Sequence, residues 1–202
     1  MSSSDANEDV PLRAFCDLLT RNALDYSDML AVIYGNSHLT WSDLDRAISE
    51  TANALLRAYP DALGERVAII MENRPEYLAS LYGAQRAGMV PAPISTRFVG
   101  REIRHVFETA RPLLCICSVH YENQVTDAFP HTKGRPPMVI VDGTTDQENK
   151  KTSWSTFIEG VPSEAPSVPL RSSNLGVQLY TGGTTGLPKG TDFTHKALLD
   201  AC

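Results

Sequence analysis

Short apolar runs alternate with amphipathic stretches through the middle of the chain, and this alternation limits the possible folds more than any other feature of the sequence. The runs have the length of β-strands, and because few polar residues interrupt them, they fit strands covered on both faces. They occupy residues 66–71, 89–94, 113–118 and 138–141. Strands separated by helices predict an α/β fold with a mostly parallel sheet, right-handed crossovers and helices on both faces.

The connections between these runs show helical periodicity. Residues 102–110 repeat apolar side chains at positions i, i+3, i+4 and i+7, which lie on one face of a helix. A second helix is predicted between residues 73 and 88, with Asn73 as its N-cap and Pro75 in its first turn. The two prolines of the run at 89–94 cannot donate to a β-ladder, so they predict a strand at a sheet edge or a bulge.

The beginning of the chain is organised differently. Residues 1–10 are polar and acidic, and we expect them to form a disordered tail. From residue 11 to residue 202 we expect a single domain portion. It begins with a helix over residues 11–24 and a β-hairpin over residues 31–41. A longer helix follows, with Thr40 or Ser42 as its N-cap.

Later in the chain, residues 142–171 are polar and rich in Thr, Ser and Pro. This composition predicts a surface connection with one short helix. Residues 175–180 form a final predicted strand, and a helix is expected to begin near His195.

Charge and cysteine usage exclude several classes of protein. The net charge of −6 argues against a nucleic-acid binder, which needs a basic face. No apolar run approaches the ~20 residues of a transmembrane helix, and no secretory signal is recognisable. The four cysteines do not form a disulfide pattern, and strand alternation places Cys115 and Cys117 on one face as core residues. We therefore expect a reducing, cytoplasmic compartment.

Residues 180–190 read Tyr-Thr-Gly-Gly-Thr-Thr-Gly-Leu-Pro-Lys-Gly and follow an apolar strand. Glycines let the backbone turn tightly and approach a ligand closely, and exposed amides in such a turn form an anion-binding concavity. Three threonine hydroxyls add neutral donors, and Lys189 adds a cation that pairs with a phosphate. This donor set, with no acidic side chain, predicts a polyphosphate site. The competing interpretation is a flexible Gly/Thr surface loop.

The segment differs from two common nucleotide motifs. A Walker A loop requires Gly-Lys followed by Ser or Thr, whereas here Pro188 precedes Lys189 and Gly190 follows it. The dinucleotide pattern G-x-G-x-x-G is also absent.

Residues 180–190 resemble the signature loop of the AMP-forming adenylating enzymes, which include acyl-CoA and aryl-CoA synthetases, luciferases and the adenylation domains of peptide synthetases. The resemblance extends over nearly all of residues 12–202, including stretches at 38–44, 64–76, 88–94 and the pair Thr194-His195. Gly182 is more typical of CoA ligases, because peptide-synthetase domains more often have a serine there.

The resemblance implies an acyl-CoA synthetase, including the fatty-acid type. A small-molecule carboxylic acid attacks the α-phosphate of Mg²⁺-ATP to give an acyl-adenylate, and the thiol of CoA then displaces AMP. A carboxylic acid with a pKa near ~4 is already ionised at pH 7, so the first step needs no protein base. The work left to the protein is positional and electrostatic.

On this resemblance we assign the phosphates of ATP to the loop, and Thr181 also to the neighbourhood of Mg²⁺. The assigned residues are Thr181, Gly182, Gly183, Thr184, Thr185, Gly186 and Lys189. His195 is expected to have a role at the start of its helix, by capping or solvation, the alternative being to line the acyl or nucleotide pocket. Four arginines at 97, 101, 104 and 111 are expected to lie on a solvated helix face, the alternative being a stripe for the phosphates of CoA.

The family's adenine-binding and acyl-binding motifs and its mobile C-terminal domain follow the phosphate loop, so the chain is expected to be an N-terminal piece without ligase turnover of its own. Two alternatives remain. One is a non-catalytic remnant that binds at most a nucleotide or a partner, and the other is part of a peptide-synthetase adenylation module.

Overall fold

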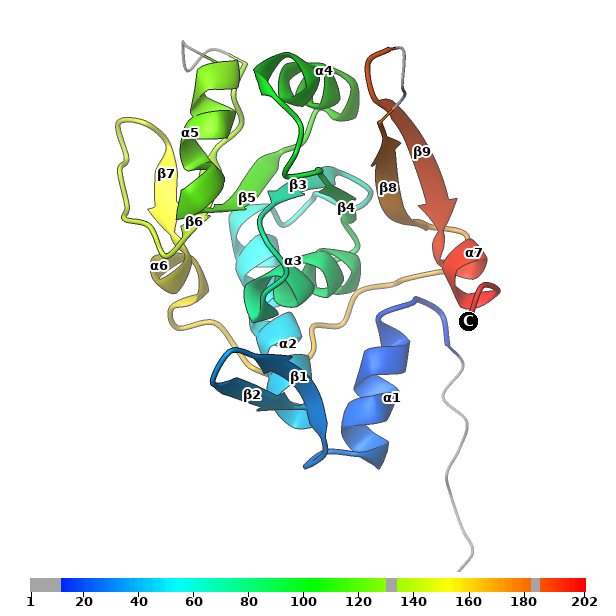
Figure 1. Cartoon of the computed structure of the whole chain (residues 1–202). Coiled ribbons are helices and arrows are strands. Elements are labelled where there is room, and N and C mark those ends of the chain that lie inside the picture. The colour runs from blue at the N-terminus through cyan, green and yellow to red at the C-terminus, as the bar shows by residue number, and fades with distance from the viewer. Residues whose placement is uncertain (1–11, 130–133, 183–185) are drawn as a thin grey trace, which may run out of the picture.

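A parallel five-stranded sheet forms the centre of the molecule (Figure 1). The computed structural model describes residues 12–129, 134–182 and 186–202. The strand order is β4-β3-β5-β6-β7, so the proline-containing β4 lies at an edge of this sheet, as the sequence predicts. The strands are β3 (Arg66–Ile70), β4 (Val90–Pro93), β5 (Leu114–Ser118), β6 (Met138–Val141) and β7 (Lys151–Ser153).

Helices cover both faces of this sheet, which confirms the predicted α/β architecture. Alternate residues of a strand point to opposite faces, so Ile69 and Ile70 belong to two different cores. The core on the side of Ile69 includes residues of α2 (Trp41–Ala58), α3 (Pro75–Arg86) and α6 (Trp154–Ile158). The core on the side of Ile70 includes residues of α4 (Gly100–Ala110) and α5 (Val119–Ala128).

The N-terminal elements lie beside α2, below the sheet in Figure 1. The predicted hairpin is present as β1 (Leu30–Tyr34) and β2 (Ser37–Thr40). Thr40 is the N-cap of α2: its hydroxyl accepts from the amide of Asp43 at 3.1 Å, and the carboxylate of Asp43 accepts from the amide of Thr40 at 3.1 Å. This reciprocal capping box selects Thr40 over Ser42.

The first helix begins later than the sequence predicts. α1 spans Asp17–Asp25, because the carboxylate of Asp17 accepts hydrogen bonds from the amides of Arg13 and Ala14, at 2.8 and 2.9 Å. These bonds satisfy the backbone amides of the preceding turn, so the turn does not need to continue the helix. The tail at residues 1–10 lies outside the described residues.

One local prediction is wrong, and two elements are additional to those predicted. Asn73 does not cap α3: Arg74 occupies the N-cap position in an extended conformation, as a residue before proline prefers. Residues 119–128, for which no element is predicted, form α5. The polar connection contains the predicted short helix α6 but also β7, which pairs with β6 in parallel.

The chain ends in a separate antiparallel hairpin, β8 (Leu175–Thr181) and β9 (Lys189–Thr194), followed by α7 (His195–Leu199). This corrects the prediction that the glycine-rich segment connects a strand to a helix, because Lys189–Thr194 is itself a strand. β9 is mostly exposed and therefore lacks the apolar run that marks a buried strand. Among the described residues, no helix is both long enough and apolar enough to cross a bilayer.

Candidate functional site

The glycine- and threonine-rich segment includes the connection between β8 and β9, residues 182–188, which we call the tip of the hairpin. Thr181 pairs with Lys189 in the antiparallel register, and this is the last pair before the tip. Gly183, Thr184 and Thr185 lie outside the described residues. The other four predicted site residues, Thr181, Gly182, Gly186 and Lys189, are all exposed. The structure therefore brings the predicted hydroxyl and the predicted cation to opposite sides of one hairpin end.

Lys189 is available to bind an anion. Within the described residues it has no salt-bridge partner, whereas Lys196 nearby in the sequence pairs with Asp200 at 2.8 Å. A cation without a protein carboxylate beside it keeps its full charge for a ligand. The exposed Thr181 hydroxyl adds a neutral donor on the opposite strand. This donor set suits the oxygens of a polyphosphate, and it includes no acidic ligand that would hold Mg²⁺ without the nucleotide.

The N-terminal part of α4 lies against the same hairpin end. The buried side chain of Phe98 comes within 3.7 Å of the position that a Cβ on Gly182 would occupy. A hollow of about 420 Å³ lies between the two elements. Its lining residues are Val99, Arg101 and Glu102 from the start of α4 and Gly186 and Leu187 from the hairpin.

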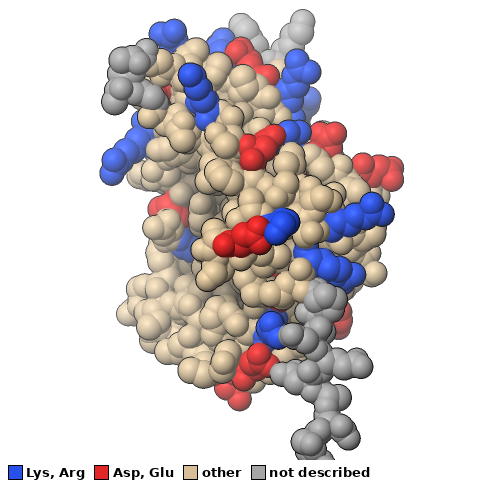
Figure 2. Space-filling model, turned by 90° about the vertical axis from the view of Figure 1, so that its right-hand side faces the viewer, with Lys and Arg blue, Asp and Glu red and all other residues tan. Residues whose placement is uncertain are grey.

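The four arginines considered together in the sequence do not form one stripe. The guanidinium of Arg104 lies over the ring of Phe129 at 5.8 Å, and Arg111 is the left-handed C-cap of α4. Arg101 is exposed and lines the hollow beside Gly186. On the face shown in Figure 2, basic side chains lie around the upper end with acidic ones between them. The mixed charges are those expected of a solvated surface.

His195 has a different place from the one expected. The cap of α7 is Thr194, whose hydroxyl accepts from the amide of Ala197 at 3.1 Å. The ring of His195 is buried, and its Nδ1 accepts a hydrogen bond from the amide of Phe15 at 3.2 Å. Burial lowers the pKa of His195, while the carboxylate of Asp17 opposes this shift. His195 therefore joins α7 to the start of the described chain and does not face solvent.

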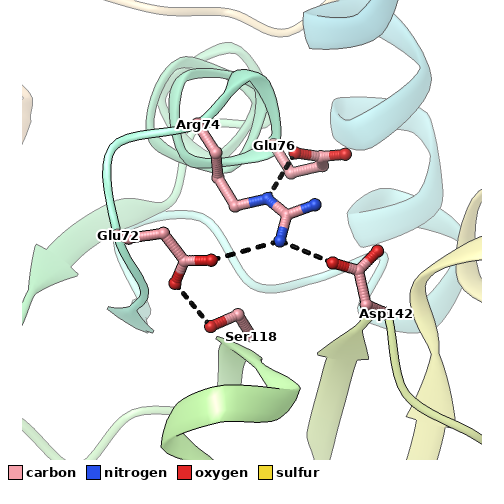
Figure 3. A network of polar contacts seen from close by, with 5 residues as sticks. All are labelled: Glu72, Arg74, Glu76, Ser118 and Asp142. Atoms are coloured by element: carbon pink, nitrogen blue, oxygen red, sulfur yellow. Dashed lines mark hydrogen bonds and ion pairs between the residues drawn. The ribbon is translucent and has the colours of Figure 1, made fainter. Parts of the chain in front are cut away.

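A second polar cluster lies at the carboxyl ends of the sheet strands (Figure 3). β3 and β5 are neighbours, and the helices that follow them, α3 and α5, cover opposite faces of the sheet. Open α/β sheets usually bind ligands at such a point. These residues come from three separate parts of the chain, so no single sequence motif marks them. They are Glu72, Arg74, Glu76, Ser118 and Asp142.

The members of this cluster bind one another. Arg74 Nε donates to Glu76 at 2.7 Å, and Nη1 lies 2.7 Å from Asp142 and 3.3 Å from Glu72. Ser118 donates to the other oxygen of Glu72 at 2.7 Å, and it makes no side-chain cap to its own helix α5. The edge that commonly holds a ligand is thus occupied by an internal network.

The electrostatics of this cluster favour the ionised forms. Burial alone would raise the pKa of Glu72, but the hydrogen bond from Ser118, a backbone bond and the guanidinium of Arg74 together hold it below its ordinary value. The hydrogen bond to Glu76 and the contact with Asp142 raise the pKa of Arg74. A carboxylate with a lowered pKa is a poor proton donor or acceptor at neutral pH. The network therefore keeps the carboxylate of Glu72 ionised at neutral pH.

A further cavity, of about 540 Å³, lies between α1 and the extended segment at 165–170. None of the residues that line it belongs to the hairpin tip. In the described part of the chain, no group of three His, Cys, Asp or Glu side chains is arranged to hold a metal ion.

Comparison with known proteins agrees with the fold and the order of motifs. The sequence model of the family described as AMP-binding enzyme matches residues 19–202. The chain is 27% identical over 175 residues to a 3-hydroxybenzoate–CoA ligase of Aromatoleum sp. (strain CIB), an alignment that covers 87% of this chain and 33% of that protein. It is 26% identical over 181 residues to a medium/long-chain-fatty-acid–CoA/3-oxocholest-4-en-26-oate–CoA ligase of Mycobacterium tuberculosis (strain ATCC 25618 / H37Rv), covering 88% and 33%.

Among solved structures, the fold is similar to that of the anthranilate CoA ligase AuaEII, crystallised with anthranoyl-AMP. The TM-score is 0.82 at 21% identity, and the match covers 95% of this chain and 37% of that one. The chain thus spans about a third of the length of the curated relatives it matches.

Proposed function

This chain belongs to the AMP-binding enzyme family, and on that premise we propose that its β8–β9 hairpin binds the phosphates of ATP in a carboxylic acid–CoA ligase. The activity of the whole protein is part of this proposal, since the chain spans a third of its relatives. The reaction forms an acyl-adenylate and pyrophosphate from the carboxylate and Mg²⁺-ATP, and CoA then displaces AMP. Relatives named for aromatic and for fatty acids support a carboxylic acid as substrate and leave its side chain open.

The observation that carries the proposal is the pairing of Thr181 with Lys189 at the base of the tip. Two anions must meet in the first half-reaction, and pyrophosphate must leave. A fixed cation beside neutral donors stabilises the charge that develops on the departing phosphates. We propose Thr181, Gly182, Gly186 and Lys189 as phosphate-binding residues in the described part of the hairpin. Gly183, Thr184 and Thr185 complete the set on the sequence motif alone.

Mg²⁺ would arrive with the nucleotide and would supply positive charge that offsets the charge of the phosphates. Thr181 is the nearest candidate in the described hairpin to contribute an oxygen, because its hydroxyl is exposed at the tip. Mg²⁺ in nucleotide sites commonly keeps several waters and takes few ligands from the protein besides the phosphates of the substrate.

A binding experiment on the 202-residue chain tests the phosphate assignment. Titration with inorganic pyrophosphate and with Mg²⁺-ATP is expected to shift the amide NMR resonances of Gly182, Gly186 and Lys189. Removing the cation by Lys189→Ala should raise the dissociation constant roughly tenfold or more, the size of a hydrogen bond to a charged group. The control is Lys196→Ala, which removes a lysine already paired with Asp200 and should leave binding unchanged.

The same substitution separates binding from turnover in a protein of the relatives' full length. There, Lys189→Ala should slow ATP–pyrophosphate exchange far more than it weakens carboxylate binding, because only the phosphates contact the hairpin. An exchange rate equal to that of the wild type would remove the assignment. A wild-type protein that binds ATP without any exchange would instead support a non-catalytic nucleotide-binding role.

A further inference from the structure

The side chain of Tyr180, on β8, lies over the neighbouring strand β9 next to the hairpin tip. It pairs with Gly190, and Gly190 does not have a positive φ, so its backbone conformation does not require glycine. A Cβ at Gly190 would lie 3.0 Å from Cζ, 3.1 Å from Cε1 and 3.2 Å from the hydroxyl of Tyr180. The aromatic ring therefore covers the backbone of the neighbouring strand and takes the place of a side chain there.

The hydroxyl of Tyr180 reaches a different element. It lies 2.9 Å from Oγ1 of Thr109, near the end of α4. The same Thr109 oxygen lies 2.8 Å from the carbonyl of His105 and 3.1 Å from that of Val106. A threonine hydroxyl has one proton, and the carbonyls of its own helix can only accept it. Thr109 thus donates into α4 and accepts from Tyr180.

The alternative acceptor for Tyr180 is weaker. Oε1 of Gln178 lies at 3.4 Å, near the limit of a hydrogen bond, whereas Thr109 lies at 2.9 Å. Gln178 is also held elsewhere, since its amide nitrogen donates to Asp192 at 2.8 Å. The contact to α4 is therefore the one that fixes the orientation of the tyrosine hydroxyl.

These contacts are made one residue pair away from Lys189. The pair Tyr180–Gly190 precedes the pair Thr181–Lys189, and the latter borders the tip. The hairpin lies close to both ends of α4: the hydroxyl of Tyr180 is 2.9 Å from Thr109, and a Cβ on Gly182 would lie 3.7 Å from Phe98, just before the first turn. The position of the cation relative to α4 thus depends on one aromatic side chain that touches both hairpin strands and the helix.

We propose that Tyr180 is a positioning residue for polyphosphate binding, which holds the pair Thr181–Lys189 in place against α4 through Gly190 and Thr109. The inference rests on the proposed function, because it concerns the same hairpin. The competing role is packing alone, since the ring of Tyr180 also contacts the buried cluster beneath α4 and α5. Packing needs the ring but not the hydroxyl, and the two roles therefore predict different effects of removing the hydroxyl.

The test compares hydroxyl deletions at the two ends of the contact in the 202-residue chain. Tyr180→Phe and Thr109→Val should each raise the dissociation constant for inorganic pyrophosphate, measured by calorimetry with Mg²⁺, roughly two- to fivefold. The double variant should bind no more weakly than either single variant, because both remove the same hydrogen bond. Gly190→Ala should weaken binding further, since the new methyl group displaces the ring.

The matched controls remove a comparable hydroxyl and leave the contact between Tyr180 and Thr109 in place. Tyr121→Phe removes a hydroxyl from a ring that packs on the same cluster, and Thr126→Val removes a helix threonine hydroxyl that donates to the carbonyl of Asn123. Both should bind pyrophosphate as the wild type does. The Tm of every variant is measured, so that a loss of folded protein is not taken for a loss of affinity.

The outcomes separate the two proposals. Unchanged affinity in Tyr180→Phe, or additive losses in the double variant, would overturn the positioning role and leave the phosphate site intact. A wild-type chain that binds no pyrophosphate at all would remove the phosphate site, and the positioning role would fall with it.

Discussion

Phe15 and His195 are 180 residues apart in the sequence, yet the amide of Phe15 donates a hydrogen bond to Nδ1 of His195 at 3.2 Å. The imidazole is only 1% exposed. Gly176 on β8 leaves the space for it, because a Cβ there would lie 2.8 Å from the same nitrogen. Phe15, two residues before α1, and the first residue of α7 are thus joined through one neutral ring.

The free energy of unfolding should fall at mildly acidic pH, because the buried ring of His195 resists protonation in the folded chain. Burial lowers the pKa of His195 below its ordinary value of 6.5. The unfolded chain therefore binds a proton before the folded chain does. The stabilisation is fully present above about pH 6.5 and is lost as the pH falls through the lower folded-state pKa. Urea unfolding of wild type and His195→Asn between pH 7.5 and 5 should show a smaller pH dependence in the variant. His38→Gln, at an exposed position, should behave as the wild type does, and equal slopes in all three proteins would contradict the prediction.

Substitution of Arg86 should destabilise the fold more than substitution of most other polar residues. It is 5% exposed and donates to Asp45, Thr20 and Ser49 at 2.6, 2.6 and 2.7 Å. Arg86→Ala leaves these partners without their donor and should destabilise the protein by about 3 kcal/mol, as removal of one member of a buried ion pair does.

The matched control for Arg86 is Arg46→Ala. Arg46 is paired with Asp43 at 2.6 Å, but its side chain is 56% exposed. Solvent screens such a pair, so the substitution should cost less than about 1 kcal/mol. Chemical denaturation measures both variants, and similar losses would show that burial does not determine the difference.

The network at the carboxyl ends of the strands should support the fold at neutral pH and weaken in acid. Because the pKa of Glu72 is lowered, its stabilising contribution is present above its ordinary value of 4.5 and is lost as the pH falls through the folded-state pKa. Ser118→Ala removes one donor and should move this pKa upward, so acid unfolding should begin at a higher pH. NMR titration of the Glu72 carboxyl measures the shift directly. Ser42→Ala, at an exposed position, should change neither the pKa of Glu72 nor the pH at which acid unfolding begins.

In the folded protein, one cysteine should react rapidly with thiol reagents and the other three should react slowly. Cys16, Cys115 and Cys117 are buried, and Cys202 is exposed. Burial, together with the nearby carboxylate of Asp17, raises the pKa of Cys16 to about 12. A buried thiol with a raised pKa has almost no thiolate at neutral pH and reacts slowly. A thiol reagent should therefore modify one equivalent rapidly in the native protein and all four in urea. Rapid loss of more than one thiol from the folded protein would contradict the described packing.

Several structural features could be predicted from the sequence because their causes are local. An apolar run such as 66–70 becomes a buried strand wherever it lies, and the alternation in 114–118 places Cys115 and Cys117 in the same core. The capping box at Thr40 needs only a neighbour three residues away. Local patterns also explain why the edge position of the proline-containing strand was predicted correctly.

Other features were decided only by the tertiary structure, because they join residues that sequence periodicity treats separately. The exposed strand β9 has no apolar pattern of its own, and it forms because β8 offers it a ladder of backbone partners. Ser118 donates to Glu72 across 46 residues, and Arg74 meets Asp142 across 68.

The same division applies to the candidate site. The residue types at 180–190 alone lead to the prediction of polyphosphate binding, which stays a prediction, since hydroxyls, amides and a cation act through their own charges and dipoles. The opposition of Thr181 and Lys189, and the ring of Tyr180 over Gly190 with its hydroxyl on α4, depend on strand register and helix packing. Those are set by the burial of side chains far away in the sequence, and so the arrangement of the site follows only from the folded chain.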